Sequence, residues 1–299
     1  MSYGCRKADL DQHLSASHLP VADPGANVTE LGAQLSFPGL KLGHPTSHHE
    51  PRRVLRIIAA PYYQKLWEAG SVENLQKVWL DCVNAHHEAW QRSGALHQDL
   101  SEHTLQVLHL NGETQGILKD WDTSLIPHDP ARLSPTYIPA GTPIFMAREL
   151  LASFVSNPTH WYRHNLEAFF YILIWAALHY NLKEGNRDKK PSIHGSRWMS
   201  EDSRTNASAK YNFCAPGSHS ANAAAKTGLK PGFEGVWRHW IKPLRDLFHL
   251  AHDELGQAMD EQEESDVPLG HDYSTVNGRI TFETFMGAIK APIRTWGDS

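Results

Sequence analysis

The chain has 299 residues, of which 40% are hydrophobic and 10% aromatic, so it is long enough for one large domain, or two small ones, with a packed core. Its formal net charge of −5, with both signs mixed along the chain, argues against a nucleic-acid surface, which would need a basic stripe. The longest apolar run, residues 169–178, is too short to cross a bilayer, so we expect no membrane partner. Residues 2–30 hold no signal-peptide core, and the odd number of cysteines predicts free thiols in a reducing compartment, the cytoplasm or nucleus.

The first half of the chain contains signals for strands and one helix. Residues 1–52 are rich in Ser, His, Pro and Gly without a sustained period, which predicts irregular structure. The apolar run 53–60 predicts a strand that ends at Pro61, and residues 72–92 carry apolar positions at helical spacing. Two short strand-like runs flank Asn111-Gly112, a dipeptide that is a strong hairpin signal.

The second half is expected to be mainly helical. Residues 165–180 are apolar on nearly every face, which predicts a buried central helix with Asn165 as its N-cap. We expect a polar insert over residues 181–232, an amphipathic helix over 233–258, a solvated acidic loop after residue 260 and a short helix over 281–290. The 20 histidines show no zinc-ligand spacing, so we favour scattered surface histidines over a zinc site.

Two acid-bearing runs point to phosphoryl transfer. His97-Gln98-Asp99 and Asp120-Trp121-Asp122 stand on either side of the predicted hairpin, which would bring Asp99 and Asp120 to one rim. Phosphoryl transfer needs one carboxylate that accepts a hydroxyl proton and a second that holds magnesium. Each run alone fits a turn or cap aspartate equally well. Two further runs accompany them, Gly-Thr-Pro-Ile-Phe-Met-Ala-Arg-Glu-Leu-Leu at 141–151 and Arg-His-Asn-Leu-Glu-Ala-Phe-Phe-Tyr at 163–171.

In this order the four runs resemble those of the fungal-type protein kinase family, over roughly residues 53–290. The resemblance implies an α+β, mainly α fold, namely a protein kinase-like C-terminal lobe with a residual small lobe. The kinase-like domain, with hinge and large lobe, would span residues 53–299. Residues 1–52 would be an irregular N-terminal segment or the remnant of a small lobe.

The resemblance also implies roles for individual residues. Asp99 would be the catalytic base, with His97 and Thr104 in the same loop, and Asp120 would be the magnesium ligand. The cofactors would be ATP and Mg²⁺, with nucleotide binding at the hinge residues Ala59, Ala60 and Pro61. Residues 141–149 would position a peptide of an unknown protein substrate or partner, and Asn165 would hold the backbone of the catalytic loop.

Several departures from the kinase pattern predict impaired Ser/Thr phosphoryl transfer. Thr104 replaces an Asn that ligates a second magnesium, and Gln98 replaces an Arg. No Gly-rich lid is visible upstream, Lys41 is the nearest candidate for the phosphate-binding lysine, and residues 1–52 are too few for a complete small lobe. Two alternatives therefore stay open. One is a non-catalytic pseudokinase or binding scaffold; the other is a small-molecule phosphotransferase of the aminoglycoside or choline kinase type.

Overall fold

The computed structural model describes residues 62–124, 141–152, 159–192, 196–264 and 270–294. All of them belong to one unit, residues 62–299, which separates from residues 1–61 by its internal contacts. The predicted strand at 53–60, the hinge residues Ala59, Ala60 and Pro61, and Lys41 lie outside the described residues. The domain boundary after residue 52 stays a prediction.

The hairpin predicted around Asn111-Gly112 is confirmed. Strands β2 (Leu105–Leu110) and β3 (Glu113–Leu118) pair antiparallel, with Leu110 opposite Glu113. Asn111 and Gly112 have φ angles of 53° and 80°, as the two central residues of a tight two-residue turn require. The short strand β1 (Gln64–Lys65) adds to β2 and gives the order β1-β2-β3.

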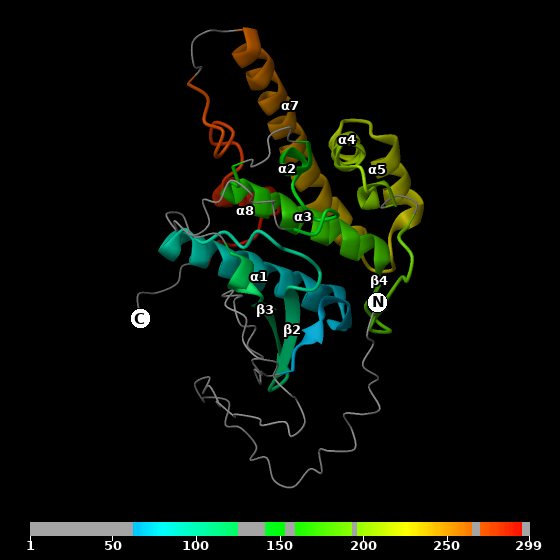
Figure 1. Cartoon of the computed structure of the whole chain (residues 1–299). Helices are drawn as coiled ribbons and strands as arrows, with labels where there is room; N and C mark the ends of the chain where they lie inside the picture. The colour runs from blue at the N-terminus through cyan, green and yellow to red at the C-terminus, as the bar shows by residue number, and fades with distance from the viewer. Residues whose placement is uncertain (1–61, 125–140, 153–158, 193–195, 265–269, 295–299) are drawn as a thin grey trace, which may run out of the picture. The chain divides into compact units, whose positions relative to one another are not determined.

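Helix α1 (Val72–Ser93) lies against this hairpin, where the sequence predicts a helix (Figure 1). The Ser71 hydroxyl caps its first turn and Gly94, with φ 70°, ends it. Gly116 of β3 faces α1 so closely that a Cβ would overlap the Val78 carbonyl oxygen. The Gly116 N–H instead donates to the Asp81 carboxylate at 2.9 Å. A glycine therefore allows the sheet to dock on α1.

Helix α3 (Tyr162–His179) is buried along its whole length, as predicted. The indole N–H of Trp79 in α1 donates to the carbonyl oxygen of Phe169 in α3 at 3.0 Å. On another side, Phe170 stacks on Phe248 of helix α7. The predicted cap at Asn165 is wrong, because the helix begins a turn earlier, after Trp161, whose N–H donates to His164 Nδ1 at 3.1 Å.

The remaining elements make the described part mixed and mostly helical, which agrees with the α+β class. Within it, no helix is long and apolar enough to span a membrane. The elements are η2 (Leu66–Glu68), η3 (Trp121–Thr123), α2 (Arg148–Ala152), β4 (Tyr180–Asn181), β5 (Asn186–Arg187), η5 (Ser196–Met199), α4 (Ser203–Cys214), α5 (His219–Ala223), η6 (Ala224–Gly228), α6 (Glu234–Val236), η7 (Trp237–Ile241), α7 (Lys242–Glu264) and α8 (Phe282–Ala288).

The polar insert expected over 181–232 contains helices, and the loop expected after residue 260 is wrong over its first residues. The polar insert contains α4 and α5, and α4 buries Ala207, Phe213 and Cys214 in the core. The acidic stretch begins as the end of α7, which continues to Glu264. Helix α8 confirms the predicted short helix near the C-terminus.

Candidate functional site

The ring of His97 joins the two acid-bearing loops. Its Nε2 lies 2.8 Å from the carbonyl oxygen of Lys119, and because a carbonyl only accepts, the ring nitrogen is the donor. Asp99 follows His97 by two residues and Asp120 directly follows Lys119. Burial lowers the pKa of His97, while the Lys119 carbonyl and the carboxylates of Asp99 and Asp120 oppose that effect. Because the His97–Lys119 hydrogen bond joins the loops that carry Asp99 and Asp120, both loops lie at one edge of the hairpin.

Both loops have a strained backbone at this edge. Gln98 has a φ of 66° and Asp120 a φ of 64°, in the left-handed region that non-glycine residues seldom adopt. Such residues cost about 1–3 kcal/mol each and cluster at functional sites. The Gln98 N–H donates to Asn165 Oδ1 of α3 at 3.3 Å. Asn165 therefore holds the backbone of the loop at residues 97–104, which we call the catalytic loop after its predicted role. This is the role that the family resemblance implies for Asn165.

The carboxylate of Asp99 is oriented from a third segment. Asp99 is half-buried, and its Oδ1 accepts a hydrogen bond from the Thr142 hydroxyl at 3.2 Å. Thr142 belongs to the Gly-Thr-Pro-Ile-Phe-Met-Ala run at 141–147, which we call the anchor segment. The family resemblance implies a role for Thr142 only as part of the peptide-positioning run at 141–149, not as a partner of Asp99. The anchor segment and the catalytic loop therefore meet at the side chain that would be the base.

Thr104 does not present its hydroxyl to this edge. The hydroxyl donates to the Ser101 carbonyl oxygen at 3.0 Å and accepts from the Ser101 N–H at 3.0 Å, and Thr104 is 5% exposed. These bonds close the turn between Asp99 and β2. The side chain at the predicted second metal-ligand position is therefore committed to the loop itself.

The donor set fits the phosphate end of a magnesium nucleotide. The Asp120 carboxylate is 56% exposed and lies 3.7 Å from the ammonium of Lys119. Mg²⁺ keeps several waters and usually binds one or two carboxylates together with substrate phosphates. Within the described ranges no cluster of three or more His, Cys, Asp or Glu side chains could form an all-protein metal cage. An exposed Asp120 carboxylate, on a loop that the His97 hydrogen bond ties to the loop of Asp99, is consistent with a site that binds Mg²⁺ together with phosphates. The metal, cofactor and catalytic roles given to these residues stay predictions.

A buried lysine in α4 holds the anchor segment in place. Lys210 of α4 is completely buried, and its ammonium donates to the carbonyl oxygens of Pro143 at 3.0 Å and Met146 at 2.5 Å. The ammonium also lies 4.3 Å from the ring centre of Tyr171 in α3. Burial lowers the pKa of Lys210 to about 7. By its spacing from Trp198, Lys210 resembles a residue of the segment that follows in the family, but a lysine in a polar stretch is usually exposed, so the sequence does not predict its burial.

Two carboxylates, the half-buried Glu149 and the buried Glu167, hold the end of the same region. Glu149 pairs with Arg163 at 2.5 Å and with His164 at 3.4 Å. Burial alone would raise the pKa of Glu149, but hydrogen bonds and charges from His164 and Arg163 lower it to about 2. Glu167 accepts from the Arg148 N–H at 3.0 Å, and His252 and other donors hold its pKa well below its usual range despite burial.

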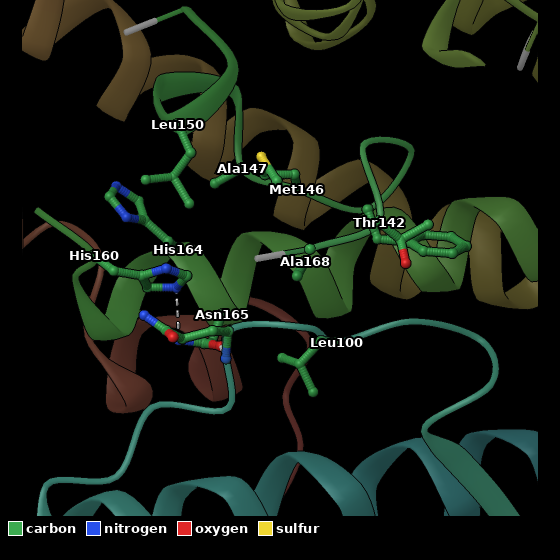
Figure 2. A pocket seen from close by; sticks show the side chains of 12 residues that line it. Leu100, Thr142, Met146, Ala147, Leu150, His160, His164, Asn165 and Ala168 are labelled. Atoms are coloured by element: carbon green, nitrogen blue, oxygen red, sulfur yellow. Dashed lines mark hydrogen bonds between the residues drawn. The ribbon is translucent and has the colours of Figure 1, made fainter. Parts of the chain in front are cut away.

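A small cavity lies between the anchor segment, the catalytic loop and α3 (Figure 2). Its volume of about 10 Å³ is room for about one water molecule. His160 and Asn165 meet at its wall, where His160 Nε2 lies 3.2 Å from Asn165 Nδ2 (Figure 2). His164 lines it too and is buried, as are His86 and His97, so the expectation of surface histidines is wrong around this site.

A comparison with known protein families identifies the family of this chain. The model of the fungal protein kinase family matches residues 8–177, more than half of the chain. The match contains the catalytic loop, the Asp-Trp-Asp run, the anchor segment and most of α3, and it begins well before residue 53. A comparison with curated proteins gives no match. The chain belongs to the fungal protein kinase family.

Proposed function

We propose that the chain is a protein kinase-like protein that binds ATP with Mg²⁺ at the edge formed by Asp99 and Asp120, and that it transfers phosphate to protein Ser or Thr slowly at best. The observation that supports this most is the hydrogen bond from Thr142 to Asp99, on the edge where His97 also binds the Lys119 carbonyl.

In this proposal Asp99 accepts the proton of the attacking hydroxyl and orients that group. Asp120 is the metal ligand, and magnesium supplies charge neutralisation of the phosphates when bound. The anchor segment and α2 position the peptide. Because the anchor segment bonds directly to the proposed base, the arrangement favours a protein substrate over the small-molecule phosphotransferase alternative.

Impairment follows from the position of Thr104. Its hydroxyl is engaged by Ser101, so the loop offers no side-chain oxygen where the kinase pattern has a second metal ligand. One lost electrostatic contact of this kind costs about 2.7–4 kcal/mol, a factor of about 10²–10³ in rate. The engaged Thr104 hydroxyl also supports the second candidate, a pseudokinase that binds a nucleotide or a protein without turnover.

The nucleotide part is tested by calorimetric titration of the whole chain with ATP, with and without Mg²⁺. We expect magnesium-dependent binding that Asp120→Asn abolishes. Asp122→Asn is the matched control, because it removes an equal charge from the same exposed turn and should leave binding intact. If the parent chain shows no magnesium-dependent binding, the nucleotide assignment is wrong and a scaffold role replaces it.

The transfer part is tested with γ-labelled ATP and a general protein substrate such as casein. We expect weak labelling that Asp99→Asn removes, and we expect Thr104→Asn alone not to restore fast turnover. Fast labelling by the parent chain would contradict impairment. Labelling that persists in Asp99→Asn would contradict the assignment of the base.

A further inference from the structure

A second and much larger cavity lies behind the catalytic loop. Its volume is about 600 Å³, and it opens between the last turn of α1, the start of α3 and residues 274–283. We call it the rear pocket. Aromatic rings dominate the part of its wall that the structure describes: His87, Trp90, Trp161, Tyr162 and Phe282. Pockets of 300–1,000 Å³ with apolar and aromatic walls are typical binding sites for small molecules.

The described rings of the rear pocket are held in place by each other. Trp90 stacks on Tyr162 with ring centres 4.4 Å apart, and His87 stacks on Phe282 at 3.6 Å. His87 Nδ1 also lies 3.1 Å from the Tyr162 hydroxyl. Because these contacts tie α1, α3 and α8 together, the wall is formed before any ligand arrives, which lowers the ordering cost of binding.

The charge of the described wall selects among ligands. Glu283, in the first turn of α8, is exposed at the pocket, and backbone and Thr281 hydrogen bonds lower its pKa, so it is ionised at neutral pH. Burial lowers the pKa of both His87 and His160, so both are neutral there. The described lining contains no Lys or Arg. A carboxylate beside aromatic rings attracts a cation and repels an anion.

The rear pocket also touches the residues that hold the catalytic loop. Leu96, which directly precedes His97, lines it, and so does His160. His160 contacts Asn165, which in turn binds the backbone of Gln98. His160 and Asn165 therefore connect a ligand in the rear pocket to the strained residue Gln98 beside Asp99.

We propose that the rear pocket is a binding site for an amphiphilic amine or quaternary ammonium compound, with the apolar tail among the rings and the cationic head at Glu283. This site is separate from the Asp99–Asp120 edge, and binding to it does not depend on nucleotide.

The test is calorimetric titration of the whole chain with three probes that share an eight-carbon tail: octyltrimethylammonium, octanol and octanoate. We expect octyltrimethylammonium to bind about 5-fold more tightly than octanol, because the exposed Glu283 carboxylate attracts the cationic head. Octanoate should bind most weakly.

Two variants locate the binding site. Glu283→Gln should remove the preference for the cation and leave octanol unchanged, whereas Glu234→Gln, in the first turn of α6, is the control and should change nothing. Gln91→Trp, at an exposed α1 position on the pocket, should fill it and weaken all three probes at least 5-fold, with folding checked by its melting curve. Binding of octanoate as tight as that of the cation, no binding of any probe, or an unchanged Gln91→Trp would overturn the proposal.

Discussion

Replacing Asn165 by alanine should release the catalytic loop. Asn165 is 2% exposed, and its carboxamide oxygen accepts the N–H of Gln98, a residue that is itself 5% exposed. No other group on an alanine could take that N–H. The same change also removes the contact between Asn165 Nδ2 and the His160 ring.

The cost can be worked from these contacts. A buried N–H that loses its acceptor costs about 1–3 kcal/mol. The left-handed backbone of Gln98 is strained by about 1–3 kcal/mol. If the loop relaxes in the variant, the release of this strain reduces the loss of stability. We therefore expect Asn165→Ala to lower the free energy of unfolding by about 2 kcal/mol. Because 1.36 kcal/mol corresponds to a tenfold change in an equilibrium constant, the equilibrium constant for local opening at Gln98 should rise about 30-fold.

Hydrogen exchange at the Gln98 amide measures the local opening, and urea unfolding measures the change in the free energy of unfolding. The matched control is Asn84→Ala, which removes another buried carboxamide, one whose Nδ2 donates within α1 to the Leu80 carbonyl oxygen. It should lower stability without a selective change at Gln98. Equal protection of the Gln98 amide in the parent chain and Asn165→Ala would refute the reasoning.

Three further changes test the buried groups around the site. Lys210 has a pKa of about 7 against 10.5 unfolded, so the unfolded chain binds the extra proton from pH 7 to 10, and stability from this residue rises by about 1.4 kcal/mol per pH unit. Lys210→Met should remove that rise in urea titrations at pH 7, 8 and 9, and parallel pH curves would contradict it. Glu149, with a pKa of about 2 against 4.5 unfolded, stabilises above pH 4.5 and loses that contribution as the pH falls toward 2. Glu149→Gln should therefore be less stable than the parent at pH 7 by up to about 3 kcal/mol, and this difference in unfolding free energy should be smaller at pH 3. A difference that stays the same at both pH values would contradict the stabilising role of this ion pair. Phe170→Ala should cost about 3–5 kcal/mol by chemical denaturation, because Phe170 is completely buried, and a near-neutral effect would place α3 outside the core.

Local sequence rules predicted the scaffold of the site well. The helical spacing over 72–92 corresponds to α1, and Asn111-Gly112 marks the turn between β2 and β3. The all-apolar run after Asn165 corresponds to the buried α3. These succeed because periodicity and turn chemistry depend on neighbouring residues.

What failed depends on contacts between distant residues. The sequence does not predict that Lys210 is buried, because the carbonyl oxygens of Pro143 and Met146 that accept from its ammonium lie far away in the chain. Asn165 reads as a cap, yet the helix starts before it, and its carboxamide serves Gln98 instead. A spacing rule cannot show which acceptor a buried side chain will meet.

For Thr104 the sequence does not predict the direction of the hydroxyl, and its proposed role stays a prediction. Its place in the loop matched the second metal-ligand position by counting, but its hydroxyl bonds to Ser101 only three residues earlier. Short-range hydrogen bonds of Ser and Thr hydroxyls to nearby backbone compete with other uses of the side chain. Counting along the sequence therefore identifies the residue type at this position, but it does not predict where the hydroxyl points.

The central claim is that Asp99 and Asp120 face one metal-phosphate site. It is tested most directly by adding Mn²⁺-ATP, as a paramagnetic substitute for Mg²⁺-ATP, to the labelled whole chain and following the backbone amide resonances of both residues. Because the His97 ring ties their loops together, we predict that both resonances broaden together, and that excess Mg²⁺-ATP restores both. Broadening at only one of the two, or at neither, would contradict the account.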